Sequence, residues 1–108
     1  MISKKRLNRI IEEYRSHLVA ILGDDLDLVV LFGSQARADS VEGSDIDILC
    51  VMKRPFHFGE LINQTSQATA QISLKHDIVL SRTLVTSDAY ASGQSPFLMN
   101  VHKEQLVL

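Results

Sequence analysis

The most informative stretch of the sequence runs from Phe32 to Val51 and reads FGSQARADSVEGSDIDILCV. It starts where an apolar run ends, turns at Gly33-Ser34 into a short helix, and crosses a polar loop to an Asp-Ile-Asp sequence. Glycine allows the main chain to approach a ligand closely because it lacks a Cβ atom. Main-chain N–H groups at such a turn bind phosphate, and the hydroxyl of Ser34 adds one more contact. The turn is therefore a candidate phosphate site.

The Asp-Ile-Asp sequence supplies the second half of the pattern. On a strand, Asp45 and Asp47 point to one face while Ile46 points into the core. Two adjacent carboxylates repel each other, and a divalent cation removes that cost. Magnesium prefers one or two carboxylates together with phosphate oxygens and water. A Gly-Ser turn or an Asp-x-Asp sequence alone is weak evidence for a functional site. The two together, in this order and at this spacing, predict a magnesium–nucleotide site.

Two apolar runs flank this region and predict strands. Leu26 to Phe32 is nearly continuous and rich in β-branched residues, as in a buried strand. Asp45 to Met52 is the second, and its alternation separates Asp45, Asp47 and Leu49 from Ile46, Ile48 and Cys50.

Helical spacing appears on both sides of these strands. From Ser3 to Leu22 the apolar residues recur at steps of three and four, which predicts an amphipathic helix with Ser3 as N-cap and Gly23 as its stop. The apolar stripe consists of Leu7, Ile10, Ile11, Tyr14, Leu18 and Ile21. A second long helix is predicted from His57 to Ser73.

The remaining residues predict shorter elements. Asp77 to Ser81 (DIVLS) reads as a third strand, and Leu106 to Leu108 as a terminal one. Helical turns are expected at Asp88 to Ala91 and at Pro96 to Gln105. This alternation predicts an α/β fold, a small mixed sheet backed by helices in a single domain over residues 1–108.

The composition narrows the functional class. A net charge of −2 gives no basic field, so direct nucleic-acid binding is not expected. No apolar run approaches the roughly 20 residues that cross a bilayer, and the N-terminus lacks the features of a signal peptide. The single cysteine, Cys50, cannot form an internal disulfide and is expected to be an inert core residue. A cytoplasmic protein is therefore expected.

The pattern resembles a known family. Gly33-Ser34, ten residues and then Asp45-Ile46-Asp47 is similar to the signature of the DNA polymerase beta-like nucleotidyltransferase superfamily. The string from Gly33 to Arg37, with Ser44 directly before the aspartates, resembles its minimal nucleotidyltransferase (MNT) branch. The tail from Ser95 to Glu104 resembles the C-terminal helix of that branch, so we expect a complete domain.

The resemblance implies roles for individual residues. Gly33 and Ser34 match the turn that binds the triphosphate, and Arg37 and Ser44 match positions near the nucleotide. Asp45, Asp47 and Asp77 match the three carboxylates that bind metal, of which the third favours deprotonation of the acceptor hydroxyl. The alternative for Arg37 is a surface salt bridge, and for Asp77 an ordinary aspartate at the start of a strand.

The sequence also departs from that branch. Ala38 and Gln105 stand where the family usually has glycine. Neither change removes a metal ligand, so an active enzyme is expected. The histidines His17, His57 and His102 have no metal-ligand spacing, which makes zinc improbable. His76 has a structural role or a place near the site.

The implied activity is transfer of AMP from ATP, with two Mg²⁺ ions stabilising the attacking and leaving oxygens. Nearly the whole chain is used to build the nucleotide half, so a partner protein is expected to supply the acceptor. The resemblance implies an antitoxin that modifies a hydroxyl, as of a tyrosine, on a HEPN-domain toxin.

Two alternatives stay open. In the first, the chain neutralises its partner by binding alone, without catalysis. In the second, it modifies a small molecule, as aminoglycoside nucleotidyltransferases do.

Overall fold

A four-stranded mixed sheet forms the centre of the computed structural model, which describes residues 3–37 and 45–108. The strands are β1 (Leu26–Phe32), β2 (Ile46–Met52), β3 (Leu80–Thr86) and β4 (Leu106–Val107), in the order β3-β2-β1-β4. β1 is antiparallel to both β2 and β4, whereas β2 and β3 are parallel. The predicted α/β class and mixed sheet are confirmed.

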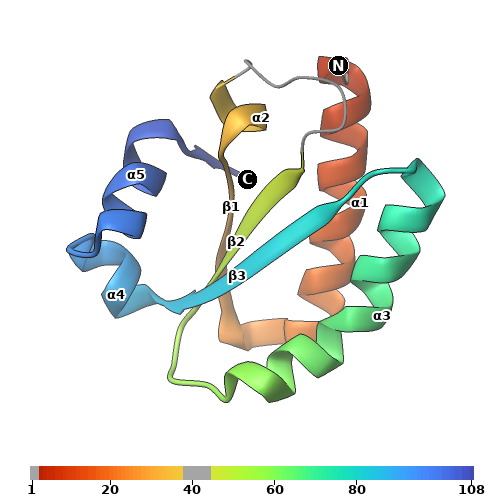
Figure 1. The fold of residues 1–108 in the computed structure, drawn as a ribbon. Coiled ribbons are helices and arrows are strands. Elements are labelled where there is room, and N and C mark those ends of the chain that lie inside the picture. The colour runs from red at the N-terminus through yellow and green to blue at the C-terminus, as the bar shows by residue number, and fades with distance from the viewer. Residues whose placement is uncertain (1–2, 38–44) are drawn as a thin grey trace.

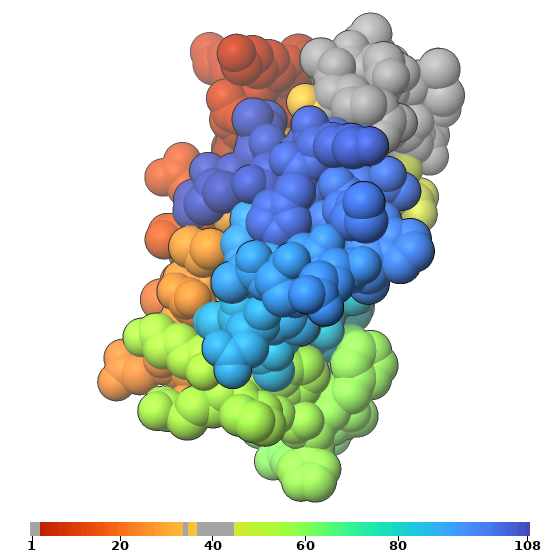
Figure 2. Space-filling model, turned by 90° about the vertical axis from the view of Figure 1, so that its left-hand side faces the viewer, coloured from red at the N-terminus to blue at the C-terminus, as the bar shows by residue number. Residues whose placement is uncertain are grey.

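Helices cover both faces of the sheet. Helices α1 (Lys4–Leu22) and α3 (Phe58–His76) lie on one face, and α4 (Ser87–Ser92) and α5 (Pro96–Glu104) on the other (Figure 1). Figure 2 looks onto the second face, over which α4 and α5 are spread. The short helix α2 (Ser34–Arg37) follows β1 at one end of the sheet.

The first helix forms as its sequence predicts. The Ser3 hydroxyl accepts a hydrogen bond from the N–H of Arg6, which satisfies one of the free donors of the first turn. Gly23 ends the helix with a φ of 59° and opens the 3₁₀ turn η1 (Gly23–Asp25). The buried stripe differs from the prediction at its last position, because Leu22 is buried and Ile21 is 37% exposed.

Each face of the sheet has its own core. The alternation of β2 sends Ile46, Ile48 and Cys50 toward α1 and α3, and Leu49 and Val51 toward α5. This confirms the alternation read from the sequence. Cys50 is fully buried, and burial raises the pKa of its thiol to about 12, so it is an inert core residue.

The predicted third strand is wrong by three residues. Helix α3 continues to His76, beyond the expected end at Ser73, and Asp77 caps it in the left-handed conformation with a φ of 52°. The strand therefore starts at Leu80 and not at Asp77. The apolar residues of the DIVL sequence are typical of a strand, which is why the prediction began at Asp77. About half of the residues of β3 are polar, and contacts with other elements stabilise the strand.

Arg82 is the clearest of these contacts. From the middle of β3 its guanidinium donates to the hydroxyl of Thr65 (2.8 Å) and to the carbonyl of Ile62 (2.9 Å), both on α3. A polar residue is thus satisfied inside the interface between sheet and helix. No local sequence pattern shows that α3 offers hydrogen-bond acceptors to Arg82. The extent of this strand could therefore not be predicted from the sequence.

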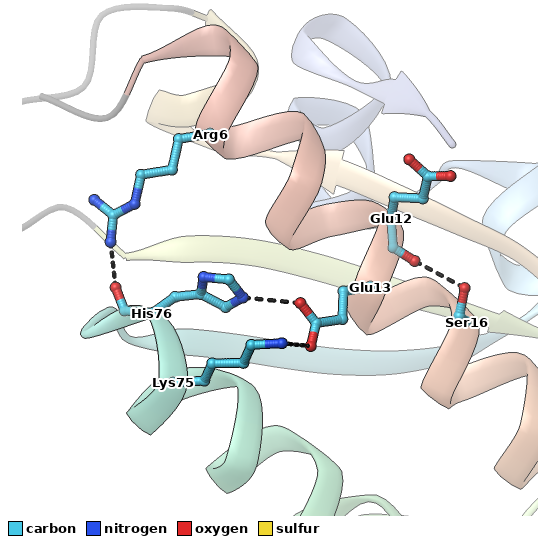
Figure 3. A network of polar contacts seen from close by, with 6 residues as sticks. All are labelled: Arg6, Glu12, Glu13, Ser16, Lys75 and His76. Atoms are coloured by element: carbon cyan, nitrogen blue, oxygen red, sulfur yellow. Dashed lines mark hydrogen bonds and ion pairs between the residues drawn. The ribbon is translucent and has the colours of Figure 1, made fainter.

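Polar contacts also join α1 to α3. The hydroxyl groups of Tyr14 and Thr69 form a buried hydrogen bond of 2.7 Å. Glu13 accepts from Lys75 (2.7 Å) and pairs with His76 (2.9 Å), and Arg6 donates to the carbonyl of His76 (Figure 3). His76 therefore has a structural role in holding the two helices together.

The C-terminal elements were predicted closely. Helix α5 begins with Pro96 after the N-cap Ser95, whose hydroxyl accepts from the N–H of Leu98. The two-residue strand β4 then pairs with β1. In the part of the chain that the structure describes, no helix is long and apolar enough to cross a membrane.

Candidate nucleotide and metal site

The turn between β1 and α2 is shaped by Gly33. Its φ is 77°, a conformation that glycine adopts without the steric cost other residues incur. The N–H of Ala36 donates to the Gly33 carbonyl at 3.1 Å and closes the turn into α2. A sharp reversal thus follows directly on the buried strand, at the place where the sequence predicts phosphate binding.

Gly33 also packs against one of the predicted metal ligands. A Cβ atom on Gly33 would collide with Oδ2 of Asp47 and lie 3.2 Å from its Cγ. The two residues meet because β1 and β2 pair in antiparallel register, with Phe32 opposite Asp47. Glycine is needed here for two reasons, the backbone conformation and the carboxylate beside it.

The two aspartates of the Asp-Ile-Asp sequence lie at the start of β2. Asp45 immediately precedes the strand and is exposed, Asp47 is half-buried, and Ile46 between them is fully buried. Alternation directs both carboxylates to the same side of the strand. This pair of oxygen donors, open to solvent on one side, fits the coordination that Mg²⁺ prefers.

Of the other predicted nucleotide-binding residues, two lie at the same end of the sheet and one lies outside the residues that the structure describes. Ser34 and Arg37 are the first and last residues of α2. Ser44 and Ala38 lie outside the described residues. Gln105 has a φ of −75°, so the glycine that the family usually carries is not required at this position. Its amide oxygen accepts from the hydroxyl of Tyr90 at 2.5 Å.

The structure does not bring Asp77 into this pair. Asp77 is an exposed helix cap, three residues before β3 begins. The β3 residue level with Asp47 is Ser81, and paired residues of parallel strands point to the same face about 4.8 Å apart. Within residues 3–37 and 45–108, no three histidine, cysteine, aspartate or glutamate side chains converge to hold a metal ion.

One residue at the site was not predicted to act there. The carboxylate of Glu104, the last residue of α5, accepts the N–H of Gly33 through Oε1 at 3.1 Å. These residues are 71 positions apart in the sequence, which predicts Glu104 only as part of a helix. The predicted strand that follows Glu104 could have indicated this contact. Its pairing with β1 brings the end of α5 to the Gly33 turn.

Comparison with known proteins places the chain in a family. Residues 10–94 match the family described as "Polymerase beta, Nucleotidyltransferase". Two relatives come from Methanocaldococcus jannaschii. The candidate protein adenylyltransferase MJ0141 is 40% identical over 72 residues, which are 67% of this chain and 72% of that one. The candidate protein adenylyltransferase MJ1305 is 42% identical over 52 residues, which are 48% of this chain but only 35% of that one.

Solved structures show the same fold at low identity. A toxin–antitoxin structure with AMP-PNP aligns with a TM-score of 0.56 and 19% identity, over 89% of this chain and 70% of that one. A mutant of the toxin–antitoxin complex MntA–HpeT aligns with a TM-score of 0.54 and 20% identity, over 100% of this chain and 72% of that one.

Proposed function

The chain belongs to the polymerase beta nucleotidyltransferase family, and on that basis we propose that it transfers AMP from ATP to a hydroxyl group of a partner protein. The observation that carries the proposal is the contact between the Gly33 turn and the Asp47 carboxylate. It joins a candidate phosphate site to a candidate metal site within one small region.

The residues present fit a magnesium ion. Asp45 and Asp47 would hold it, since they offer two carboxylates on one side of β2. A bound metal would neutralise charge on the phosphates and on the leaving pyrophosphate. The Gly33-Ser34 turn would fix the triphosphate, so that catalysis consists mostly of positioning and charge neutralisation.

The acceptor is proposed to belong to a protein. The relative MJ0141, which aligns with 67% of this chain, is named as a protein adenylyltransferase. The structural neighbours are toxin–antitoxin complexes. We therefore assign the chain as an MNT antitoxin and its partner as a HEPN-domain toxin, with a tyrosine hydroxyl as acceptor. The role of Asp77 as a third carboxylate, predicted from the sequence, is not part of this proposal, because Asp77 caps α3 three residues before β3 begins.

A second candidate function has one observation in its favour. The described residues do not assemble three carboxylates, and Ser81 occupies the position on β3 beside Asp47. A site with two carboxylates could bind a nucleotide without catalysing its transfer. The chain would then neutralise its partner by binding alone.

One experiment separates the two. The partner encoded beside this gene is incubated with this protein and Mg-ATP, and its intact mass is measured. We expect the partner to gain whole AMP units with the wild type and none with Asp45→Asn or Asp47→Asn. An unchanged mass with the partner bound and inhibited would support the binding-only antitoxin instead.

A further inference from the structure

The end of α5 lies level with the Gly33 turn because of how β4 pairs with β1. Leu106 is paired with Leu31, and the same antiparallel register continued for two residues sets Glu104 opposite Gly33. At Glu104 the chain is already helical, so β4 no longer supplies a main-chain acceptor. The side chain of Glu104 accepts the N–H of Gly33 instead, at 3.1 Å.

The base of this carboxylate is fixed on both sides. Before it, Leu98 and Val101 bury α5 in the core beneath the sheet face, with 5% and 1% of their surface exposed. After it, the N–H of Leu108 donates to the carbonyl of Val29 at 2.9 Å. A half-buried carboxylate on so rigid a support restrains the residue that it binds.

The restrained residue is the one whose position matters most. Gly33 has a φ of 77°, and its Cα lies against the Asp47 carboxylate. A flexible glycine can leave that conformation easily, because it has many others available. A hydrogen bond from its N–H to an acceptor on a fixed support opposes this movement.

We propose that Glu104 is a positioning residue, which holds the Gly33-Ser34 turn in the shape that receives the triphosphate of ATP. The inference rests on the proposed function, since it takes that turn as the nucleotide site. Glu104 acts through Gly33 and is not itself assigned any contact with the nucleotide. Its carboxylate works as a hydrogen-bond acceptor at a fixed reach, and its negative charge is not required.

Three variants separate reach from charge. Glu104→Gln keeps an acceptor at the same reach and removes the charge, Glu104→Asp keeps the charge and shortens the reach, and Glu104→Ala removes both. The exposed neighbour Lys103→Ala is the matched control on α5. Binding of Mg-ATP is measured by titration calorimetry, and thermal melts check that each variant is folded.

The expected result follows from the loss of one hydrogen bond to the Gly33 N–H. Glu104→Ala and Glu104→Asp should both weaken Mg-ATP binding by about tenfold, and Glu104→Gln should stay within about threefold of the wild type. Lys103→Ala should not change the affinity. If Glu104→Ala does not fold, the Gln and Asp variants still decide the matter.

Other outcomes overturn the proposal. Equal or tighter binding by Glu104→Asp and Glu104→Ala would show that the carboxylate does not hold the turn, or that it obstructs the phosphates. A Gln variant as weak as the Asp variant would show that the negative charge is needed as well as the reach, which contradicts the proposal.

A second readout distinguishes failure of this inference from failure of the proposed function. Hydrogen exchange of the Gly33 amide, followed by NMR without nucleotide, should accelerate in Glu104→Asp and not in Glu104→Gln. Wild type that binds no Mg-ATP but shows this pattern would refute the proposed nucleotide site alone. Unchanged exchange in all variants would refute the role of Glu104.

Discussion

Gly33 and Asp47 are in direct contact, with the Asp47 carboxylate occupying the space where any other residue at position 33 would place its Cβ atom. The contact ties the conformation of the β1–α2 turn to the carboxylate at the start of β2. Its geometry leads to a test of the site that does not depend on knowing the partner.

Gly33→Ala should destabilise the protein and weaken Mg-ATP binding. The positive φ costs an alanine about 1–2 kcal/mol, and the collision with Asp47 adds to this. Gly59→Ala is the control, because Gly59 lies in α3 without a positive φ and has nothing within 4 Å of its Cβ position. Urea unfolding should show a larger loss for Gly33→Ala, and equal losses would contradict the contact.

Asp47→Asn should lower AMP transfer by about a hundredfold or more while the fold is retained. The substitution keeps the size of the side chain and removes the charge that would hold the metal. Transfer is read from the intact mass of the partner, and folding from a thermal melt. Asp24→Asn is the control, since Asp24 is exposed before β1, at the opposite end of that strand. A melt showing that Asp47→Asn is unfolded would count against the assignment.

Asp77→Asn is expected to leave metal-dependent Mg-ATP binding within about twofold of the wild type. Asp77 is exposed and caps α3, where asparagine tolerates the left-handed conformation equally well. Ser81→Asp, in contrast, places a carboxylate level with Asp47 and should tighten binding of Mn²⁺. Calorimetry with Mg-ATP checks the first prediction, and calorimetry with Mn²⁺ checks the second. A large loss with Asp77→Asn would support its predicted role as the third ligand.

Acid should weaken the link between α1 and α3. Hydrogen bonds from Lys75 and then His76 hold the pKa of Glu13 below its ordinary value. Because the folded pKa is the lower one, the stabilisation is present above about pH 4.5 and is lost as pH falls through the folded pKa. Melting temperatures of wild type and Glu13→Gln should therefore differ at neutral pH and converge in acid.

The neighbouring Glu12→Gln serves as the control for Glu13, because the Glu12 side chain points away from Lys75 and His76 (Figure 3). It should not alter the pH dependence of the melting temperature. A wild type and Glu13→Gln pair whose difference persists at low pH would show that the ion pairs do not stabilise the fold.

Tyr14→Phe should cost about 1 kcal/mol of unfolding free energy. The variant removes a hydroxyl that is buried and bonded to Thr69, and burial raises the pKa of that hydroxyl. Tyr90→Phe is the control, since its hydroxyl bond to Gln105 is only partly buried. Urea unfolding at pH 7 should show the larger loss at Tyr14.

Most of the helices and strands could be predicted from the sequence, because their signals are local. The Ser3 cap, the apolar run of β1, the alternation of β2 and the Ser95-Pro96 start of α5 each depend on neighbours a few residues away. The sequence also predicts that Gly33, Asp45 and Asp47 belong to one candidate site, because a single loop joins the turn to the start of the next strand.

The contacts between distant segments of the chain could be read only from the folded protein. The extent of β3 depends on Arg82 finding partners on α3, and the residue beside Asp47 is set by strand register, which gives Ser81 and not Asp77. Glu104 reaches Gly33 through the pairing of β4 with β1. These contacts join residues far apart in the chain, and side-chain reach and register between strands are properties that no local pattern carries.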